Sequence, residues 1–202
     1  PLGAACIARN STESNSSMPP MPRATPATRR AVMRSFSNQA ENGTLRLDRS
    51  LVTPAEAIEM VRKVFSDHPV ASGKKLETLE VAVATSVTDS SLLGRVLANM
   101  VKNAFEATPT GGTVRIWCEA AAGSCGFFVW NEGAIPPNIA RRIFERSFST
   151  KSRSGRGLGT YAMKLFGERY LGGKVSFTST AEDGTVFSIW LPAAPLPTPQ
   201  TT

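Results

Sequence analysis

The strongest constraint on the fold is an amphipathic stretch at residues 90–107, which has the length and period of a surface helix. It begins at the serines near Ser90 and is stopped by Pro109 and a Gly111-Gly112 pair. Its apolar residues recur at helical spacing, at Leu92, Leu93, Val96, Leu97, Met100, Val101 and Ala104. A helix with one apolar stripe buries that stripe against another layer of structure, so this segment predicts a layered domain.

Helical and strand-like segments alternate along the rest of the chain. A capping box at 53–56, with proline at the first helical position, begins a helix that ends near Pro69. A helical turn or two is expected at 136–143 and a longer helix at 158–170. Strands are expected at 76–84, 113–119, 126–130, 174–180 and 185–191, the last two as a hairpin. The pattern predicts a two-layer α/β sandwich with one mixed sheet and helices on one face.

Composition separates this region from the two ends of the chain. Residues 1–30 are rich in Ser, Pro, Thr and Asn, so we expect a disordered tail or a remnant of cloning. Residues 31–50 are expected to form a linker with a short helix and a strand, residues 51–192 the domain, and 193–202 a proline-rich tail. No apolar run is long enough for a membrane span, so no membrane contact is expected from this part of the protein.

The cysteine and histidine content excludes several kinds of site. Cys6, Cys118 and Cys125 are odd in number and lack metal-ligand spacing. The last two fall in strand-like runs, so we expect small buried side chains in a reducing compartment. His68 is the only histidine and stands at a helix exit, where we expect a solvated imidazole. A multi-histidine metal site is therefore excluded.

The positive charge of the chain is concentrated in two segments. Residues 1–49 and 141–156 together carry more than the whole formal net charge of +7, and the second segment holds six basic and one acidic side chain. Aromatic residues are scarce in both segments and neither forms a long basic face, so nucleic acid is not the expected partner. A polyphosphate ligand beside residues 141–156 explains the local excess.

A glycine-rich segment follows directly. Residues 153–164 read RSGRGLGTYAMK, with Gly155, Gly157 and Gly159 just before the expected last helix. Glycine lets backbone N–H groups approach a ligand, and the first turn of a helix offers unpaired donors with a partial positive charge. The segment therefore predicts a phosphate cradle. The alternative at this point is a glycine-rich surface loop that caps a helix.

Polar side chains share one face of the helix at 90–107. Asn99, Asn103 and Glu106 stand at i, i+4 and i+7, beside the apolar stripe. Two asparagines in mid-helix reduce helix stability, whereas their amide oxygens suit a hard cation such as Mg²⁺ that is shared with substrate phosphates. The alternative is a solvated polar face. The glycine-rich segment downstream favours the ligand-binding interpretation.

Five segments together resemble the motifs of one family. Residues 96–107 look like the N box, 129–137 the G1 box, 143–151 the F box, 155–159 the G2 box and 184–187 the G3 element of the GHKL ATP-binding domain, also called HATPase_c. The five occur in the family's order, from about residue 50 to residue 191. The chain thus resembles the catalytic domain of bacterial sensor histidine kinases, whose two-layer sandwich is known as the Bergerat fold.

The resemblance implies a role for each matched residue. Asn103 would bind Mg²⁺ with Asn99 beside it, and these two with Lys151 would form the catalytic set. Asn131 would recognise adenine, with Gly133 leaving space for the ring and Thr185 supporting the contact. Residues 138–155 would be a mobile lid. The other residues implied to bind the nucleotide are Lys102, Ile135, Phe144, Ser149, Thr150, Gly155, Arg156, Gly157, Leu158, Gly159 and Thr160.

The chain departs from the family pattern in two places, the G1 box and residue 106. Asn131 stands where the G1 box has aspartate, and Ala134-Ile135 replaces its second glycine, so weaker nucleotide binding is expected. Glu106 stands where many members carry lysine. Hydrolysing relatives carry a glutamate at the position of Asn99, and an amide cannot act as a general base. The resemblance therefore implies phosphoryl transfer to a protein group, not to water.

The resemblance also implies partners. The γ-phosphate of ATP would go to a histidine on a separate dimerisation element, and from there to a response regulator. Residues 31–50 would then be the end of that dimerisation hairpin. Since His68 lies inside the ATP-binding part, we expect this chain to be unable to phosphorylate itself. Because members of the family dimerise through the hairpin, we expect this chain to be monomeric and to be part of a longer dimeric, cytoplasmic or membrane-anchored bacterial kinase. The alternatives are a serine/threonine kinase of the anti-sigma-factor type and a degenerate nucleotide-binding interaction module.

Overall fold

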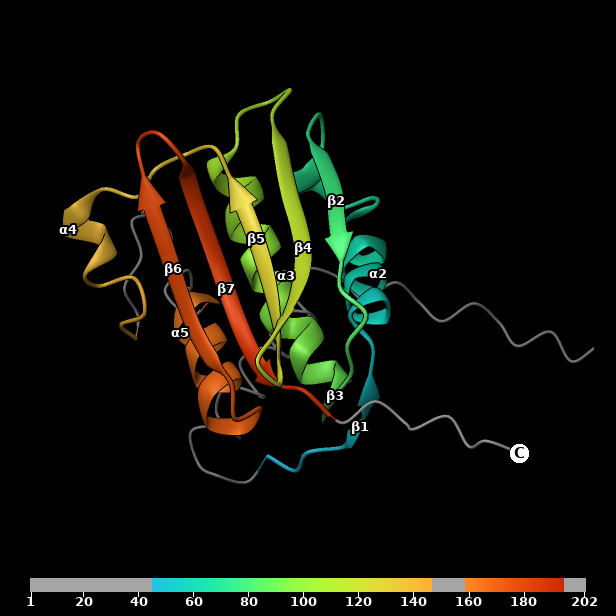
Figure 1. The fold of residues 1–202 in the computed structure, drawn as a ribbon. Helices are drawn as coiled ribbons and strands as arrows, with labels where there is room; N and C mark the ends of the chain where they lie inside the picture. Colours follow the sequence, from blue (N-terminus) through green and yellow to red (C-terminus); the bar gives the residue numbers. More distant parts are fainter. Residues whose placement is uncertain (1–44, 147–158, 195–202) are drawn as a thin grey trace, which may run out of the picture.

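A five-stranded mixed sheet forms one layer of the protein, and α2, α3 and α5 lie behind it in the view of Figure 1. The computed structural model describes residues 45–146 and 159–194. The sheet has the order β2 (Lys75–Val81), β4 (Thr113–Ala121), β5 (Ser124–Asn131), β7 (Gly184–Pro192) and β6 (Lys174–Thr180). β2 pairs parallel with β4, and the other pairs are antiparallel. The two-layer α/β sandwich expected from the sequence is confirmed.

A second, two-stranded sheet was not expected. β1 (Arg49–Val52) pairs antiparallel with β3 (Ser86–Asp89). The strand expected at 76–84 is wrong at its C-terminal end, because β2 ends at Val81 and the chain then turns into β3. β3 was not predicted because its sequence, SVTD, is short and polar, although Ser86, Thr88 and Asp89 are buried in the structure. The sheet is therefore mixed as predicted, but it is not the only one.

Both long helices begin where local sequence predicts, although the first ends at Phe65, before the expected end near Pro69. α2 (Pro54–Phe65) begins with the capping box, in which Thr53 N donates to Glu56 Oε2 at 3.0 Å and Glu56 N to Thr53 Oγ1 at 3.3 Å. α3 (Ser90–Ala107) is capped by Asp89, whose Oδ1 accepts from Leu92 N at 2.9 Å. At the other end Lys74 Nζ donates to the Phe105 carbonyl at 2.7 Å, so one of the terminal carbonyls that α3 cannot pair internally has a partner.

The last helix changes its hydrogen-bonding pattern halfway. α5 (Gly159–Lys164) is a regular α-helix, and the π-helical segment η2 (Leu165–Tyr170) continues it. One continuous α-helix over 158–170 was therefore a wrong expectation, and residue 158 lies outside the described residues. A Cβ on Gly167 would overlap Val175 and lie 3.0 Å from Ile189 Cδ1. The glycine thus lets the wider helix pack directly on β6 and β7. α4 (Pro137–Ala140) is the short helix expected at 136–143.

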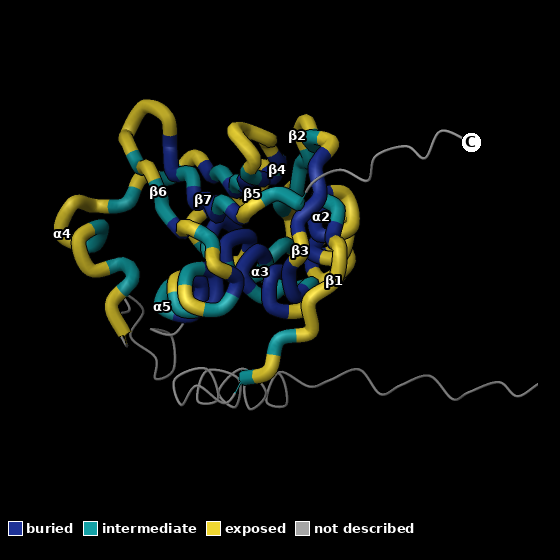
Figure 2. Tube along the Cα trace, turned by 60° about the horizontal axis from the view of Figure 1, so that its bottom comes forward, coloured by how far each residue is buried: buried dark blue, intermediate teal, exposed yellow. Residues whose placement is uncertain are grey.

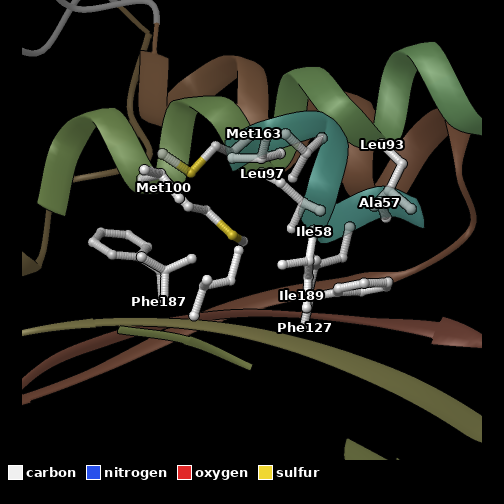
Figure 3. Close-up of a cluster of buried hydrophobic side chains, with 14 of the residues drawn as sticks. Ala57, Ile58, Leu93, Leu97, Met100, Phe127, Met163, Phe187 and Ile189 are labelled. Atoms are coloured by element: carbon white, nitrogen blue, oxygen red, sulfur yellow. The ribbon is translucent and has the colours of Figure 1, made fainter. Parts of the chain in front are cut away.

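The core lies between the sheet and the helices (Figure 2). Met100 and Leu97 of α3 and Met163 of α5 point toward Phe187 and Ile189 of the sheet, with Ile58 of α2 nearby (Figure 3). Each of these residues is less than 5% exposed. The apolar stripe recognised in the sequence is the face of α3 that the sheet covers.

Cys118 and Cys125 are both buried, as predicted.

His68 is not the solvated side chain that was expected. It is half-buried, its Nδ1 accepts from Val70 N at 3.1 Å, and its ring lies 5.2 Å from that of Phe65. Through this contact the imidazole caps the short 3₁₀ helix η1 (Pro69–Ala71).

Expectations for the two chain ends and for most of the glycine-rich segment fall on residues 1–44, 147–158 and 195–202, outside the described residues. Among the residues that the structure does describe, every helix is too short or too polar to reach across a lipid bilayer.

Candidate functional site

The polar face of α3 lies directly opposite the start of α5. A Cβ built on Gly159 would lie 3.9 Å from Asn103 Oδ1 and 4.0 Å from Asn99 Oδ1. The last glycine of the expected phosphate cradle is therefore next to both asparagines, although some 60 residues separate them in sequence. Glycine at this position keeps the space between the helices free of a side chain. Of the two interpretations of this polar face, the structure favours a shared site over a solvated surface.

The side-chain amide of Asn99 places a buried hydrogen-bond donor beside Gly159. Its Nδ2 is buried and has no hydrogen-bond partner among the residues that the structure describes. Leaving such a group unpaired costs about 1–3 kcal/mol, so native proteins normally give it a partner. A phosphate oxygen of a bound ligand is a suitable acceptor.

A second group of predicted residues meets at the end of β5. Asn131 is the last residue of this strand and pairs in register with Thr185 of β7. The Asn131 side chain is buried, and its Nδ2 donates to the Gly133 carbonyl at 3.2 Å. Thr185 Oγ1 donates to the same carbonyl at 2.6 Å. The structure therefore brings Asn131, Gly133 and Thr185 together, as the resemblance implied.

The donor and the acceptor of each hydrogen bond around the Gly133 carbonyl can be assigned. Ile135 N donates to Ser179 Oγ at 2.8 Å, and Ser179 Oγ lies 2.8 Å from Thr185 Oγ1. Because the single Thr185 proton goes to Gly133, the Ser179 hydroxyl must be the donor in this pair. The Gly133 carbonyl can only accept, so Asn131 must turn its NH₂ toward it. Its Oδ1 is then left to accept a hydrogen bond from a ligand, as an adenine amino group requires.

Ser179 was not among the residues predicted from the sequence. Polar residues alternate along most of β6, so Ser179 does not stand out by itself. The signal was available in the expected hairpin, because its register places Ser179 directly across from Thr185. Gly184, which begins the G3 element, pairs with Thr180 at the same hairpin end.

The other predicted residues that the structure describes lie around these two groups. Ile135 and Phe144 are half-buried against the core. The Phe144 ring lies 5.7 Å from that of Phe177 and has Lys164 Nζ 5.2 Å from its centroid. Thr160 follows Gly159 in α5. Lys102 is exposed on α3, with its Nζ 3.4 Å from Glu106 Oε1, so it is paired along the helix.

The remaining predicted residues lie outside the described residues: Ser149, Thr150, Lys151, Gly155, Arg156, Gly157 and Leu158. Their expected contacts with phosphate, including the catalytic role of Lys151, stay predictions. The described residues thus carry the amide groups of α3, the start of α5 and the Asn131 group.

The donor set suits a nucleotide and a hard cation. In residues 45–146 and 159–194 there is no cluster of three or more His, Cys, Asp or Glu side chains that could hold a metal ion. A cation at this place would therefore take one amide oxygen from α3 and its other ligands from phosphate and water, which is how Mg²⁺ is commonly bound. The unpaired Asn99 donor and the space opposite Gly159 fit such a phosphate-bound ion.

We expect Thr185→Val to destabilise the protein by about 1–3 kcal/mol and to weaken binding of an ATP analogue. The change keeps the shape of the side chain but removes one donor from the Gly133 carbonyl and the acceptor of the Ser179 hydroxyl. Urea unfolding and calorimetric titration measure the two effects. Ser176→Ala is the matched control, because it removes a hydroxyl pair of the same two strands, Ser176 with Ser188, away from Asn131. Equal loss of analogue binding in both variants would contradict the role of the Thr185 hydroxyl.

Comparison with protein families places the matched region over most of the described residues. The sequence model of the family described as "Histidine kinase-, DNA gyrase B-, and HSP90-like ATPase" matches residues 88–195. Among curated proteins, the sensor histidine kinase CusS of Escherichia coli is 31% identical over 165 residues, covering 78% of this chain and 34% of that protein. The hybrid signal transduction histidine kinase D of Dictyostelium discoideum is 28% identical over 172 residues, 78% of this chain and 11% of that protein. The chain therefore spans about a tenth to about a third of the length of these relatives.

Solved structures of histidine kinases are also similar to this chain. The catalytic domain of the histidine kinase ThkA, in a nucleotide-free form, is 28% identical and superposes with a TM-score of 0.64, covering 72% of this chain and 96% of that one. The mycobacterial sensor histidine kinase MprB is 28% identical with a TM-score of 0.62, covering 74% of this chain and all of that one.

Proposed function

This chain belongs to the family of histidine kinase-, DNA gyrase B- and HSP90-like ATPases, and from that premise we propose that it is the ATP-binding catalytic domain of a sensor histidine kinase. The γ-phosphate of ATP would be transferred to a histidine on a separate dimerisation and phosphoacceptor element, and from there to a response regulator. The observation that carries the proposal is the meeting of Asn99 and Asn103 with Gly159. It joins the N box to the end of the G2 box, which a triphosphate site requires.

Each part of the nucleotide has a proposed contact. Asn131 accepts from the adenine amino group through Oδ1, held in that orientation by Gly133 and Thr185. Asn103 supplies the protein oxygen for Mg²⁺, and the Asn99 NH₂ donates to a phosphate oxygen. Bound Mg²⁺ would neutralise charge on the phosphates during transfer. Gly159 of α5 leaves room for the same ligand, because it has no Cβ to fill the space beside Asn103 and Asn99.

Transfer to a protein side chain is favoured over hydrolysis. A water molecule attacking ATP needs a group that takes its proton, and the Asn99 amide cannot do so. The single histidine of the chain is a poor phosphoacceptor, because its Nδ1 accepts from Val70 N and its ring packs against Phe65. The acceptor is therefore a residue of a partner protein or of another part of the same protein.

Isothermal calorimetry with a non-hydrolysable ATP analogue is the first test. We expect binding that requires Mg²⁺, with an affinity reduced by the neutral Asn131. Absence of binding at millimolar analogue would support the alternative of a degenerate interaction module. The specific observation that keeps this alternative is the replacement of the charged adenine acceptor of the G1 box by Asn131.

Phosphoryl transfer is tested with labelled ATP. The chain alone is expected to remain unlabelled, and label should appear on an added phosphoacceptor fragment, such as that of CusS, which this chain resembles. Acid-labile label on the added fragment supports a histidine kinase, and acid-stable label would support the serine/threonine kinase alternative. We propose a monomeric state for this chain and a cytoplasmic location for the domain, within a longer dimeric protein.

A further inference from the structure

Two buried thiols face each other at the end of the sheet that lies away from Asn131. Cys118 of β4 and Cys125 of β5 have their Sγ atoms 3.2 Å apart, and each residue is 1% exposed. Neither residue has a part in the proposed nucleotide site. Asn131 ends β5, whereas Cys125 is the second residue of that strand.

Strand pairing explains why the two sulfur atoms meet. Cys118 pairs with Phe127 and Ala120 pairs with Cys125, so the cysteines are diagonal neighbours across an antiparallel pair. Diagonal neighbours are normally too far apart for a disulfide, but strand twist shortens one of the two diagonals. At 3.2 Å the side chains already point at each other, and a bond needs a further approach of the sulfur atoms of about 1 Å.

The two thiols also differ in acidity. The hydrogen bond between the two sulfur atoms lowers the pKa of the Cys125 thiol, whereas the same contact and burial raise the pKa of the Cys118 thiol. Cys125 is thus the better nucleophile toward an oxidant, and Cys118 is a neighbouring thiol able to react with the product.

A hairpin turn lies beside Cys125, which is 1% exposed when the hairpin is closed. β4 and β5 are joined by Ala122 and Gly123, both exposed and both with positive φ, +46° and +74°. Alanine in this conformation is strained by about 1–2 kcal/mol. Local opening of this hairpin end, at the last register pair of Ala121 with Ser124, would let a small solute reach Cys125.

We propose that Cys118 and Cys125 form a reversible oxidation site for hydroperoxides. The Cys125 thiolate attacks a peroxide oxygen, so the O–O bond breaks and Cys125 becomes a sulfenic acid with release of one water. The Cys118 thiol then attacks this sulfur, forming the disulfide and releasing a second water. Two thiols together lose two protons and two electrons, and hydrogen peroxide is reduced to two waters. Cellular thiols would reverse the bond by exchange, as expected of a disulfide in a reducing compartment.

The test uses the full chain with Cys6→Ser, which leaves the two buried thiols as the only ones. The folded protein is treated with hydrogen peroxide, unfolded in the presence of an alkylating reagent and analysed by mass spectrometry. We expect loss of both alkylation sites, a mass lower by two hydrogen atoms, one cross-linked peptide containing Cys118 and Cys125, and recovery of both sites with dithiothreitol. Two alkylated cysteines after treatment, or disulfides only between chains, would overturn the proposal.

Variants separate a built site from general thiol oxidation. Cys118→Ala should leave Cys125 unable to form the bond, so that treatment yields sulfinic acid that dithiothreitol does not reverse. Ala122→Asn, which suits the turn better, should slow disulfide formation several-fold by holding the hairpin end closed. If Cys118→Ala fails to fold, the proposal is still tested by the protein that has both Cys118 and Cys125, because its cross-linked peptide is detected without this variant. An oxidation rate in folded protein that rises only with the fraction unfolded by urea would count against the site.

Discussion

Asn103→Ala is expected to abolish Mg²⁺-dependent ATP binding, by at least about 100-fold or about 2.7 kcal/mol, without destabilising the protein. Its amide oxygen lies opposite Gly159, and alanine offers no ligand there. Asparagine is a poor residue in mid-helix, so alanine should stabilise α3 by about 0.5 kcal/mol. The affinity for ATP should therefore fall while the free energy of unfolding rises, as expected of a side chain that serves binding and not folding.

Calorimetry with the ATP analogue, with and without Mg²⁺, measures the first effect, and urea unfolding of the ligand-free protein measures the second. Ser91→Ala is the matched control, since Ser91 is exposed in the first turn of the same helix. It should leave the titration unchanged. If Asn103→Ala binds the analogue with unchanged Mg²⁺ dependence, the assignment of the metal ligand is wrong.

Gly184→Ala should cause the largest loss of stability among single changes in the hairpins, roughly 3 kcal/mol. The residue has a φ of +78°, and an added Cβ would overlap the Asn131 carbonyl oxygen and lie 2.9 Å from the Glu132 carbonyl oxygen. Both neighbours are backbone atoms, so they cannot move without shifting the loop that carries Gly133. Whatever protein remains folded should also bind ATP more weakly.

Gly123→Ala separates the two causes. Gly123 has nearly the same φ, +74°, but a Cβ there would meet nothing within 4 Å. Only the backbone strain should appear in this variant, about 1 kcal/mol by urea unfolding. Equal destabilisation by the two changes would mean that the contact with Asn131 and Glu132 has no energetic importance.

Local patterns predicted the helices well because a helix end is made by residues close in sequence. The capping box of α2 and the apolar stripe of α3 involve neighbours three or four positions apart, and both appear in the structure where they were expected. The strand β3 and the π-helical η2 were missed. β3 is stabilised by pairing with β1, more than 30 residues earlier, and η2 by the close approach of Gly167 to Val175 and Ile189.

In the candidate site, the identity of the residues could be predicted from sequence, but the orientation of their side chains could not. Asn99, Asn103 and Asn131 could be selected from motif resemblance alone. The orientation of the Asn131 amide could not, because it depends on a series of hydrogen bonds from Ile135 through Ser179 and Thr185 to Gly133, on three separate segments. The meeting of Cys118 with Cys125 likewise follows from strand register and twist, not from residue type.

By itself the sequence determined the family, the two-layer fold and the residue types of a nucleotide site, because periodicity, caps and motif order are recorded in neighbouring residues. Only the tertiary structure decided which atoms face one another: Gly159 against the α3 amides, Ser179 against Thr185, and one thiol against the other. Hydrogen bonds act over about 3 Å and have a direction, so their partners are settled by how distant segments pack together.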